Sequence, residues 1–232
     1  ALGFLFISYM LDKKVKSKKI KNLTKDRASD LLVYTMIFGL LGARLVHVIS
    51  DFHLYKNNLI GIFQIWNGGL AFHGGLLAII FGYYYCKKYK IDMLKLMDLV
   101  FLYLPLIVAF GRIANFMNSE FYGAETNAVW CVVYQKIDML CRHPTSLYQS
   151  LSQFLNFGIL MLISKMKFIK KTGIISGFFM INYGVFRFFT DFLRLDYETL
   201  YFGLSHSQYS NLIMLIVGLY LVTRKEAKLG KS

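Results

Sequence analysis

Residues 111–123 read Gly-Arg-Ile-Ala-Asn-Phe-Met-Asn-Ser-Glu-Phe-Tyr-Gly and follow directly after the apolar run 96–110. Arg112 and Asn115 are three residues apart, so a helix would place both side chains on one face. Strongly polar groups are costly in hydrocarbon unless they have partners or water. A frayed helix end could explain one arginine here, but a polar cluster closed by a glycine indicates a binding site.

Outward from this cluster the chain is strongly apolar. Of its 232 residues, 56% are hydrophobic and only 17% are charged. The apolar residues fall into blocks near the roughly 20 residues that a helix needs to cross a bilayer. This composition excludes an ordinary soluble globule and predicts an all-α polytopic membrane protein.

We predict a single transmembrane domain over residues 1–232 with about seven helices, the first truncated. A small extracytoplasmic head, residues 118–145, is expected within it, and the β-prone run 128–134 predicts a strand or two there. The predicted spans are residues 1–11, 31–50, 70–86, 96–117, 146–164, 173–192 and 204–223.

The net charge of +14 comes mainly from short loops. Residues 13–27, 87–95, 165–171 and 224–231 carry 20 of the 27 Lys and Arg residues. Alternating spans would place all four segments on the cytoplasmic side, together with the C-terminus, as the positive-inside rule requires. The basicity therefore indicates membrane orientation and the lipid bilayer as a partner, and no nucleic acid.

Five helices are expected to bring polar side chains to the same outer leaflet. Snorkelling arginines or interfacial histidines would explain single cases, but five coincident clusters favour one shared site. Guanidinium groups suit the phosphate of a lipid headgroup. The residues in question are Arg44, His47, Asp51, His73, Arg112, Asn115, Glu120, His143, Tyr148, Tyr183, Arg187, Asp191 and Arg194.

Other polar residues point to structural roles. Asp98 lies toward the cytoplasmic end of its span and is expected to be an interfacial cap or a packing partner. Cys131 and Cys141 both lie in the outer segment, where oxidation into a disulfide is one of two open alternatives. The sequence has no metal-ligand spacing and no serine-nucleophile motif, so we expect neither a metal nor an organic cofactor.

Four sequence blocks together resemble the bacterial prolipoprotein diacylglyceryl transferase family. Residues 111–123 match Gly-Arg-x-Ala-Asn-Phe-x-Asn-x-Glu-x-x-Gly at every fixed position. Similar blocks are the glycine-flanked histidine at 66–75, Arg-His-Pro-x-x-Leu-Tyr at 142–148 and Tyr-Gly-x-Phe-Arg at 183–187. Residues 1–4 resemble the middle of the family's first helix, so the resemblance covers nearly the whole chain in order.

The resemblance implies a lipid transfer reaction. The diacylglyceryl group of phosphatidylglycerol would move to the lipobox cysteine in the signal peptide of a prolipoprotein, forming a thioether and releasing glycerol phosphate. This would be the first step of bacterial lipoprotein maturation, at the outer leaflet of the plasma membrane. Catalysis would fall to Arg112, Arg187 and, as candidate base, His73. The binding residues would be Arg44, Gly74, Gly75, Asn115, Asn118, Glu120, Gly123, His143, Tyr148, Tyr183, Asp191 and Arg194.

Three departures from the family pattern keep alternatives open. The family usually has Glu where this chain has Gln149, and Glu where it has Asp191. The Trp-Tyr pair that precedes the first-helix motif lies before the first residue of this sequence. A catalytically inactive lipid-binding relative is therefore one alternative. An anion or lipid transporter is the other, although it would spread its charges through the depth of the bilayer.

Overall fold

The computed structural model describes residues 2–16, 20–56, 58–67, 69, 75–166, 171–194 and 201–224. These residues form seven α-helices and one small antiparallel sheet, which confirms the prediction of a mostly helical fold with a strand or two. The helices are α1 (Leu2–Lys16), α2 (Lys25–Ser50), α3 (Leu76–Lys88), α4 (Met93–Met117), α5 (Thr145–Lys165), α6 (Ile174–Asp191) and α7 (His206–Thr223). The strands are β1 (Val132–Val133) and β2 (Cys141–Arg142), and short 3-10 helices occupy Phe52–Leu54, Leu59–Phe63, Ile65–Asn67 and Tyr201–Gly203.

The helix boundaries follow local capping signals. Helix α2 begins before the predicted position 31, because the Thr24 hydroxyl accepts the Arg27 N–H and caps the helix at Lys25. Helix α7 begins after a capping box formed by Ser205 and Gln208. Residues 70–74, the predicted start of the third span, lie outside the described residues.

The distribution of polar and apolar side chains suits lipid rather than water. Helices α2 and α4 are each long and apolar enough to cross a membrane. Helix α5 exposes large apolar side chains such as Leu151 and Leu162 and buries polar ones such as Gln149 and Asn156. Outward apolar faces and inward polar groups are the arrangement that a hydrocarbon environment favours.

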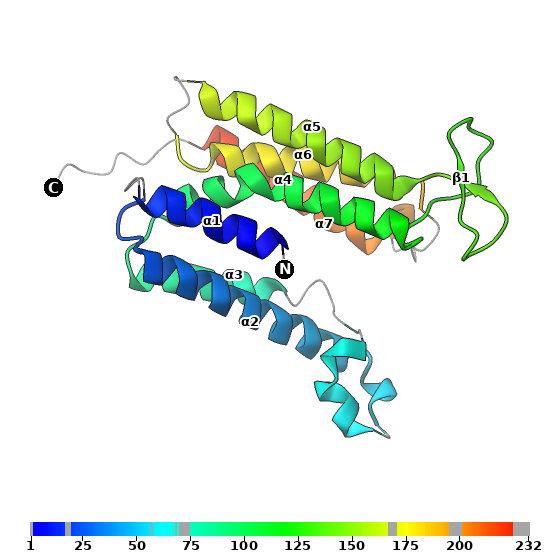
Figure 1. Ribbon diagram of the computed structural model, residues 1–232, viewed down its shortest axis with the longest axis horizontal. Helices are drawn as coiled ribbons and strands as arrows, with labels where there is room; N and C mark the ends of the chain where they lie inside the picture. Colours follow the sequence, from blue (N-terminus) through cyan, green and yellow to red (C-terminus); the bar gives the residue numbers. More distant parts are fainter. Residues whose placement is uncertain are drawn as a thin grey trace. The chain divides into compact units, whose positions relative to one another are not determined.

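The described chain divides into two compact units, residues 1–96 and 97–232, which we treat separately. In the first unit, α2 packs on both α1 and α3 (Figure 1). The α2–α3 contact is aromatic: the rings of Phe38 and Phe81 stack with centroids 4.6 Å apart.

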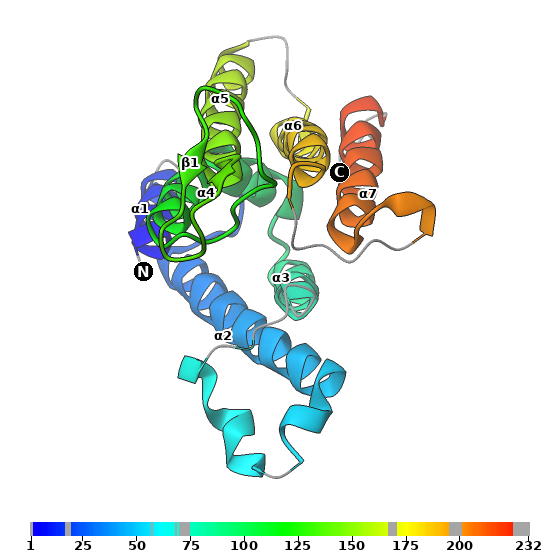
Figure 2. The same ribbon diagram turned by 90° about the vertical axis from the view of Figure 1, so that its right-hand side faces the viewer.

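In the second unit, α6 lies between α5 and α7 (Figure 2). Glycines bring α6 and α7 close together. A Cβ atom on Gly177 would lie 2.9 Å from the Gly218 carbonyl oxygen, and one on Gly184 would lie 2.9 Å from that of Asn211. Small residues of this kind allow backbones to approach where helices pack in a membrane.

Asp98 of α4 caps the N-terminus of α6. Its carboxylate accepts hydrogen bonds from the backbone N–H of Gly173 at 2.7 Å and of Ser176 at 2.8 Å, and from the Ser176 hydroxyl at 2.7 Å. The first turn of a helix has N–H groups without intrahelical partners and a positive dipole end, so a carboxylate there stabilises it. The structure thus gives Asp98 the capping role, one of the two that were predicted.

We expect the Asp98→Asn substitution to lower the free energy of unfolding by about 2–4 kcal/mol, because it removes a charge and turns amide hydrogens toward buried donors. Unfolding of the purified protein in detergent measures this loss. The control is Asp26→Asn at an exposed position in the first turn of α2. Equal stability of the two variants would contradict the capping role.

Candidate active site

The polar residues that end α4 form a chain of hydrogen bonds. The Arg112 guanidinium donates to the Asn115 side-chain oxygen at 3.3 Å, and the Asn115 amide donates to the Glu120 carboxylate at 2.6 Å. The Glu120 backbone N–H bonds back to the Asn115 carbonyl at 2.8 Å, so the chain turns sharply after the helix. Glu120 and Asn115 together orient the side chain of Arg112.

The beginning of α5 holds this turn in place through hydroxyl groups. Thr145 donates to the Phe121 carbonyl, Ser146 to the Glu120 carbonyl at 2.8 Å, and Ser150 to the Ala109 carbonyl of α4 at 3.0 Å. All three hydroxyl residues are buried. They bond backbone carbonyls of the turn after α4 and of α4 itself.

Gly123 closes the turn against two other segments. Its N–H donates to the His143 carbonyl at 2.9 Å, and it pairs with Arg194 in an isolated β-bridge. A Cβ atom here would lie 2.7 Å from the Leu193 carbonyl oxygen and 2.7 Å from the His143 Cβ atom. The structure therefore explains Gly123 by close backbone packing, and the ligand-binding role predicted for it is untested.

Helix α6 contributes the ridge of Tyr183, Arg187 and Asp191. Arg187 Nε lies 3.2 Å from a carboxylate oxygen of the buried Asp191, and the Asn211 amide of α7 lies 3.5 Å from the other oxygen. The shorter side chain of Asp191 thus reaches Arg187 despite the departure from the family pattern. This pair fixes the direction of the Arg187 guanidinium.

Arginines from these segments meet in one place. Arg112 interacts with the Tyr183 side chain and lies near Arg187 and Arg194. The guanidinium carbons of Arg112 and Arg194 lie 5.2 and 4.7 Å from the centre of the Phe121 ring. Both cations therefore make a cation–π interaction with the same ring. Within the described residues, Arg112 forms no ion pair with a carboxylate. Such a group of cations attracts an anion.

A small cavity opens beside this group between α4, α5 and α6. Its volume is ≈ 10 Å³, which is room for about one water molecule. Its lining consists of Val108, Arg112, Gln149, Ser152, Gln153, Tyr183 and Arg187.

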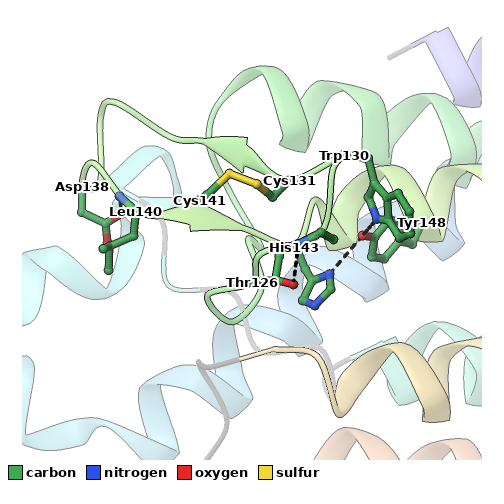
Figure 3. Close-up of a disulfide and its surroundings, with 9 residues drawn as sticks. Thr126, Trp130, Cys131, Asp138, Leu140, Cys141, His143 and Tyr148 are labelled. Carbon is green, nitrogen blue, oxygen red and sulfur yellow. Dashed lines mark hydrogen bonds between the residues drawn. A yellow bond between two sulfur atoms is a disulfide. The ribbon is translucent and has the colours of Figure 1, made fainter.

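The head carries a second cluster, shown in Figure 3. The Tyr148 hydroxyl accepts a hydrogen bond from the Trp130 indole at 2.7 Å and lies 3.1 Å from His143 Nδ1. A disulfide joins Cys131 to Cys141, which decides the alternative that the sequence left open. It closes the loop 131–141 directly after Trp130, and so it supports the position of the indole against Tyr148.

An ion pair joins this loop to the residue that follows it. The Arg142 guanidinium hydrogen-bonds the Asp138 carboxylate, and this holds the pKa of Asp138 below its ordinary value. The Arg142 guanidinium also lies 5.4 Å from the centre of the Tyr122 ring. The head is thus organised by a disulfide, an ion pair and hydrogen bonds around a very small sheet.

Arg44 lies in the first unit and organises a loop there. It is buried, and its guanidinium donates to the carbonyls of Ile62 at 2.8 Å and Gly69 at 3.0 Å. Gly69 has φ 74°, and a Cβ atom there would lie 2.3 Å from His47 Nε2. His47 Nδ1 in turn lies 2.8 Å from the Asp51 carboxylate. These contacts explain why the predicted stripe Arg44, His47 and Asp51 is polar, whereas its role in binding a substrate stays a prediction.

The remaining predicted site residues are His73, Gly74, Gly75 and Asn118. His73 and Gly74 lie outside the described residues. Gly75 is described at the start of α3, and Asn118 is exposed in the turn after α4. The structure therefore brings together the predicted residues of α4 and α6 with the turn between α4 and the head.

Sequence reasoning missed two contributions to this site. Phe121 falls at a variable position of the motif, and only its place between Glu120 and Gly123 could have drawn attention to it. Gln153 had no signal beyond its spacing of four residues from Gln149, which puts both on one face of a helix. Among the described residues, no group of three His, Cys, Asp or Glu side chains is arranged to hold a metal ion.

Taken together, the fold and the site define a helical protein of membrane type with a cluster of arginines near the ends of α4 and α6. Residues 1–224 match the family model described as prolipoprotein diacylglyceryl transferase. The chain belongs to this family.

Relatives from several bacteria support this assignment, and each is named phosphatidylglycerol–prolipoprotein diacylglyceryl transferase. The protein from Finegoldia magna is 38% identical over 220 residues, which cover 94% of this chain and 86% of the relative. That from Polynucleobacter necessarius is 35% identical over 206 residues, covering 86% and 78%. That from Rickettsia rickettsii is 34% identical over 231 residues, covering 97% and 89%.

We expect the Gly123→Ala substitution to destabilise the protein by about 1–3 kcal/mol, because the added methyl group overlaps backbone atoms that cannot move independently. The matched control is Gly158→Ala in α5, where a Cβ atom meets nothing within 4 Å. The control is expected to be neutral or stabilising, since alanine favours a helix over glycine. Comparing the unfolding temperatures of the two variants tests the packing role, which similar values would refute.

The disulfide makes a chemical prediction. In denaturant without a reductant, only Cys86 should react with an alkylating reagent, and all three cysteines should react after reduction. Reduction should also destabilise the head by about 2–3 kcal/mol on the chain-entropy model of a short closed loop. Mass spectrometry of peptides from both samples shows the outcome. Alkylation of Cys131 or Cys141 without a reductant would contradict the bond.

Proposed function

We propose that this chain transfers the diacylglyceryl group of phosphatidylglycerol to the lipobox cysteine thiol of a prolipoprotein, as the names of its relatives indicate for those proteins. The single observation that carries the proposal is the position of Arg112. Its guanidinium lies near Arg187 and beside Tyr183, without a carboxylate partner among the described residues. A partly buried cation of this kind is costly unless an anion completes the site.

The anion in this proposal is the phosphate of the lipid headgroup. Arg112 and Arg187 contact its oxygens, since a planar guanidinium donates two parallel hydrogen bonds to a phosphate. Tyr183 contacts Arg112, and Arg194 adds positive charge beside the same Phe121 ring as Arg112. Asn115 and Glu120 orient Arg112 through the hydrogen bonds described above.

The chemistry that follows is a displacement at carbon. The substrate thiolate attacks the glyceryl carbon that bears the phosphate, a C–S bond forms, and the C–O bond breaks. Glycerol phosphate leaves with the electron pair of that bond. Arg112 and Arg187 neutralise the charge that develops on the leaving phosphate, and such electrostatic stabilisation is usually the largest catalytic term. The thiol proton passes to a base, for which His73 is the candidate.

The membrane arrangement completes the proposal. Seven spans form one transmembrane domain in the bacterial plasma membrane, with the C-terminus in the cytoplasm and the site toward the outer leaflet. Two features support it. The site residues lie near the C-terminal ends of α4 and α6 and the N-terminal end of α5. The basic segments lie at the opposite ends of these helices, as expected for cytoplasmic loops.

The alternatives fit the geometry less well. A transporter would place its binding groups near the middle of the bilayer, whereas Arg112 and Arg187 both lie within five residues of the ends of their helices. An inactive lipid-binding relative would have lost the contacts that orient the arginines. Those contacts are present, because Asp191 reaches Arg187.

We expect Arg112→Gln and Arg187→Gln each to lower the rate of transfer by about 100- to 1000-fold, the usual effect of removing one group that stabilises a developing anion. The assay combines purified protein, phosphatidylglycerol and a lipobox peptide, and follows the mass gain on the peptide cysteine. The control is Arg27→Gln, an arginine in the opposite, basic segment. Wild-type turnover by Arg112→Gln would refute the assignment.

The same assay separates the alternatives. Binding of phosphatidylglycerol by the wild-type protein without any transfer would identify an inactive relative. Absence of both binding and transfer would refute the function itself.

A further inference from the structure

Two glutamines of α5 carry buried amide atoms that lack partners. Gln149 and Gln153 are one helical turn apart and only 4% and 3% exposed. Within the described residues, both side-chain atoms of Gln149 and the side-chain oxygen of Gln153 have no hydrogen-bond partner. A buried amide without a partner is costly, and nearly all such groups in folded proteins are satisfied by protein, water or a ligand.

These amides face the small cavity beside the arginines. Gln149 and Gln153 line it together with Arg112, Tyr183 and Arg187. Ser152, which also lines it, is already satisfied, since its hydroxyl donates to the Gln149 carbonyl at 2.8 Å. A partner for the Gln149 amide N–H is therefore expected inside the cavity.

The size and charge of the cavity indicate what that partner is. Its volume of ≈ 10 Å³ admits a group about as large as one oxygen, and it cannot hold a whole phosphate. Two guanidinium groups in its lining disfavour a cation. An amide N–H donates to an anionic oxygen, and an amide oxygen accepts from a guanidinium N–H, so both ends of Gln149 suit this setting.

We propose that Gln149 forms the inner end of the headgroup site, where its amide N–H donates a hydrogen bond to one oxygen of the phosphate held by Arg112 and Arg187. The proposal rests on the function proposed above and adds a binding residue to it. Because Gln149 is neutral, it does not neutralise the charge of Arg112, which is left to the anion.

The test measures anion binding apart from turnover. Glycerol phosphate and inorganic phosphate are titrated into the purified full chain, and phosphatidylglycerol in nanodiscs gives the KM for transfer. We expect Gln149→Met, which keeps the volume and removes both polar atoms, to weaken glycerol phosphate binding and raise the KM by about tenfold, the usual effect of losing a hydrogen bond to a charged group.

The control is Asn156→Leu, which removes a buried amide two turns further along α5. That amide bonds to Asn182 at 3.0 Å and does not line the cavity. The Asn156→Leu substitution should lower the unfolding temperature without changing the affinity for glycerol phosphate. This separates loss of stability from loss of a phosphate contact.

Each result then decides one question. Unchanged affinity in Gln149→Met would overturn the proposal and leave a water molecule as the occupant of the cavity. Loss of inorganic phosphate and glycerol phosphate affinity in parallel would support it and show that the phosphate itself is recognised. Absence of transfer by the wild-type protein, with normal phosphate binding, would refute the proposed function but not this contact.

Discussion

The three hydrogen bonds that Asp98 accepts from the start of α6 determine the register of α4 against α6. Fourteen residues separate Asp98 from Arg112, and fourteen separate Gly173 from Arg187. At 1.5 Å per residue, both distances along the helices are about 21 Å. One contact at the far end therefore brings the two guanidinium groups to the same level, and a shift of one residue would separate them.

The site combines groups that oppose folding when they are considered alone. Like charges close together in a medium of low dielectric repel each other, and buried amides without partners add a further cost. The surrounding structure holds them through contacts that involve no substrate: hydroxyl groups of α5 on the turn after α4, and Asp191 on Arg187. A ligand that supplies negative charge relieves this opposition, so binding of an anion and stability of the site are coupled.

Sequence reasoning located the helices and the arginines because both follow from periodicity and composition. Arg112, Asn115 and Glu120 were predicted as a cluster and are hydrogen-bonded in a chain. Phe121 could not be predicted, because its ring contacts Arg112 and Arg194 only after the turn folds with φ 54° at that residue. Arg44 was predicted from its helical spacing, but its carbonyl partners lie in an irregular loop that has no periodic signal. The pairing of Cys131 with Cys141 likewise needs three-dimensional proximity.

The disulfide of the head also bears on how the chain reaches its orientation. Thiols oxidise in the compartment outside the cytoplasm and stay reduced within it. In the proposed topology, Cys131 and Cys141 can bond only after residues 118–145 have been translocated, so loop closure must follow insertion. A chain inserted the other way round would keep two free thiols and an open loop. The bond then distinguishes correctly inserted chains from inverted ones.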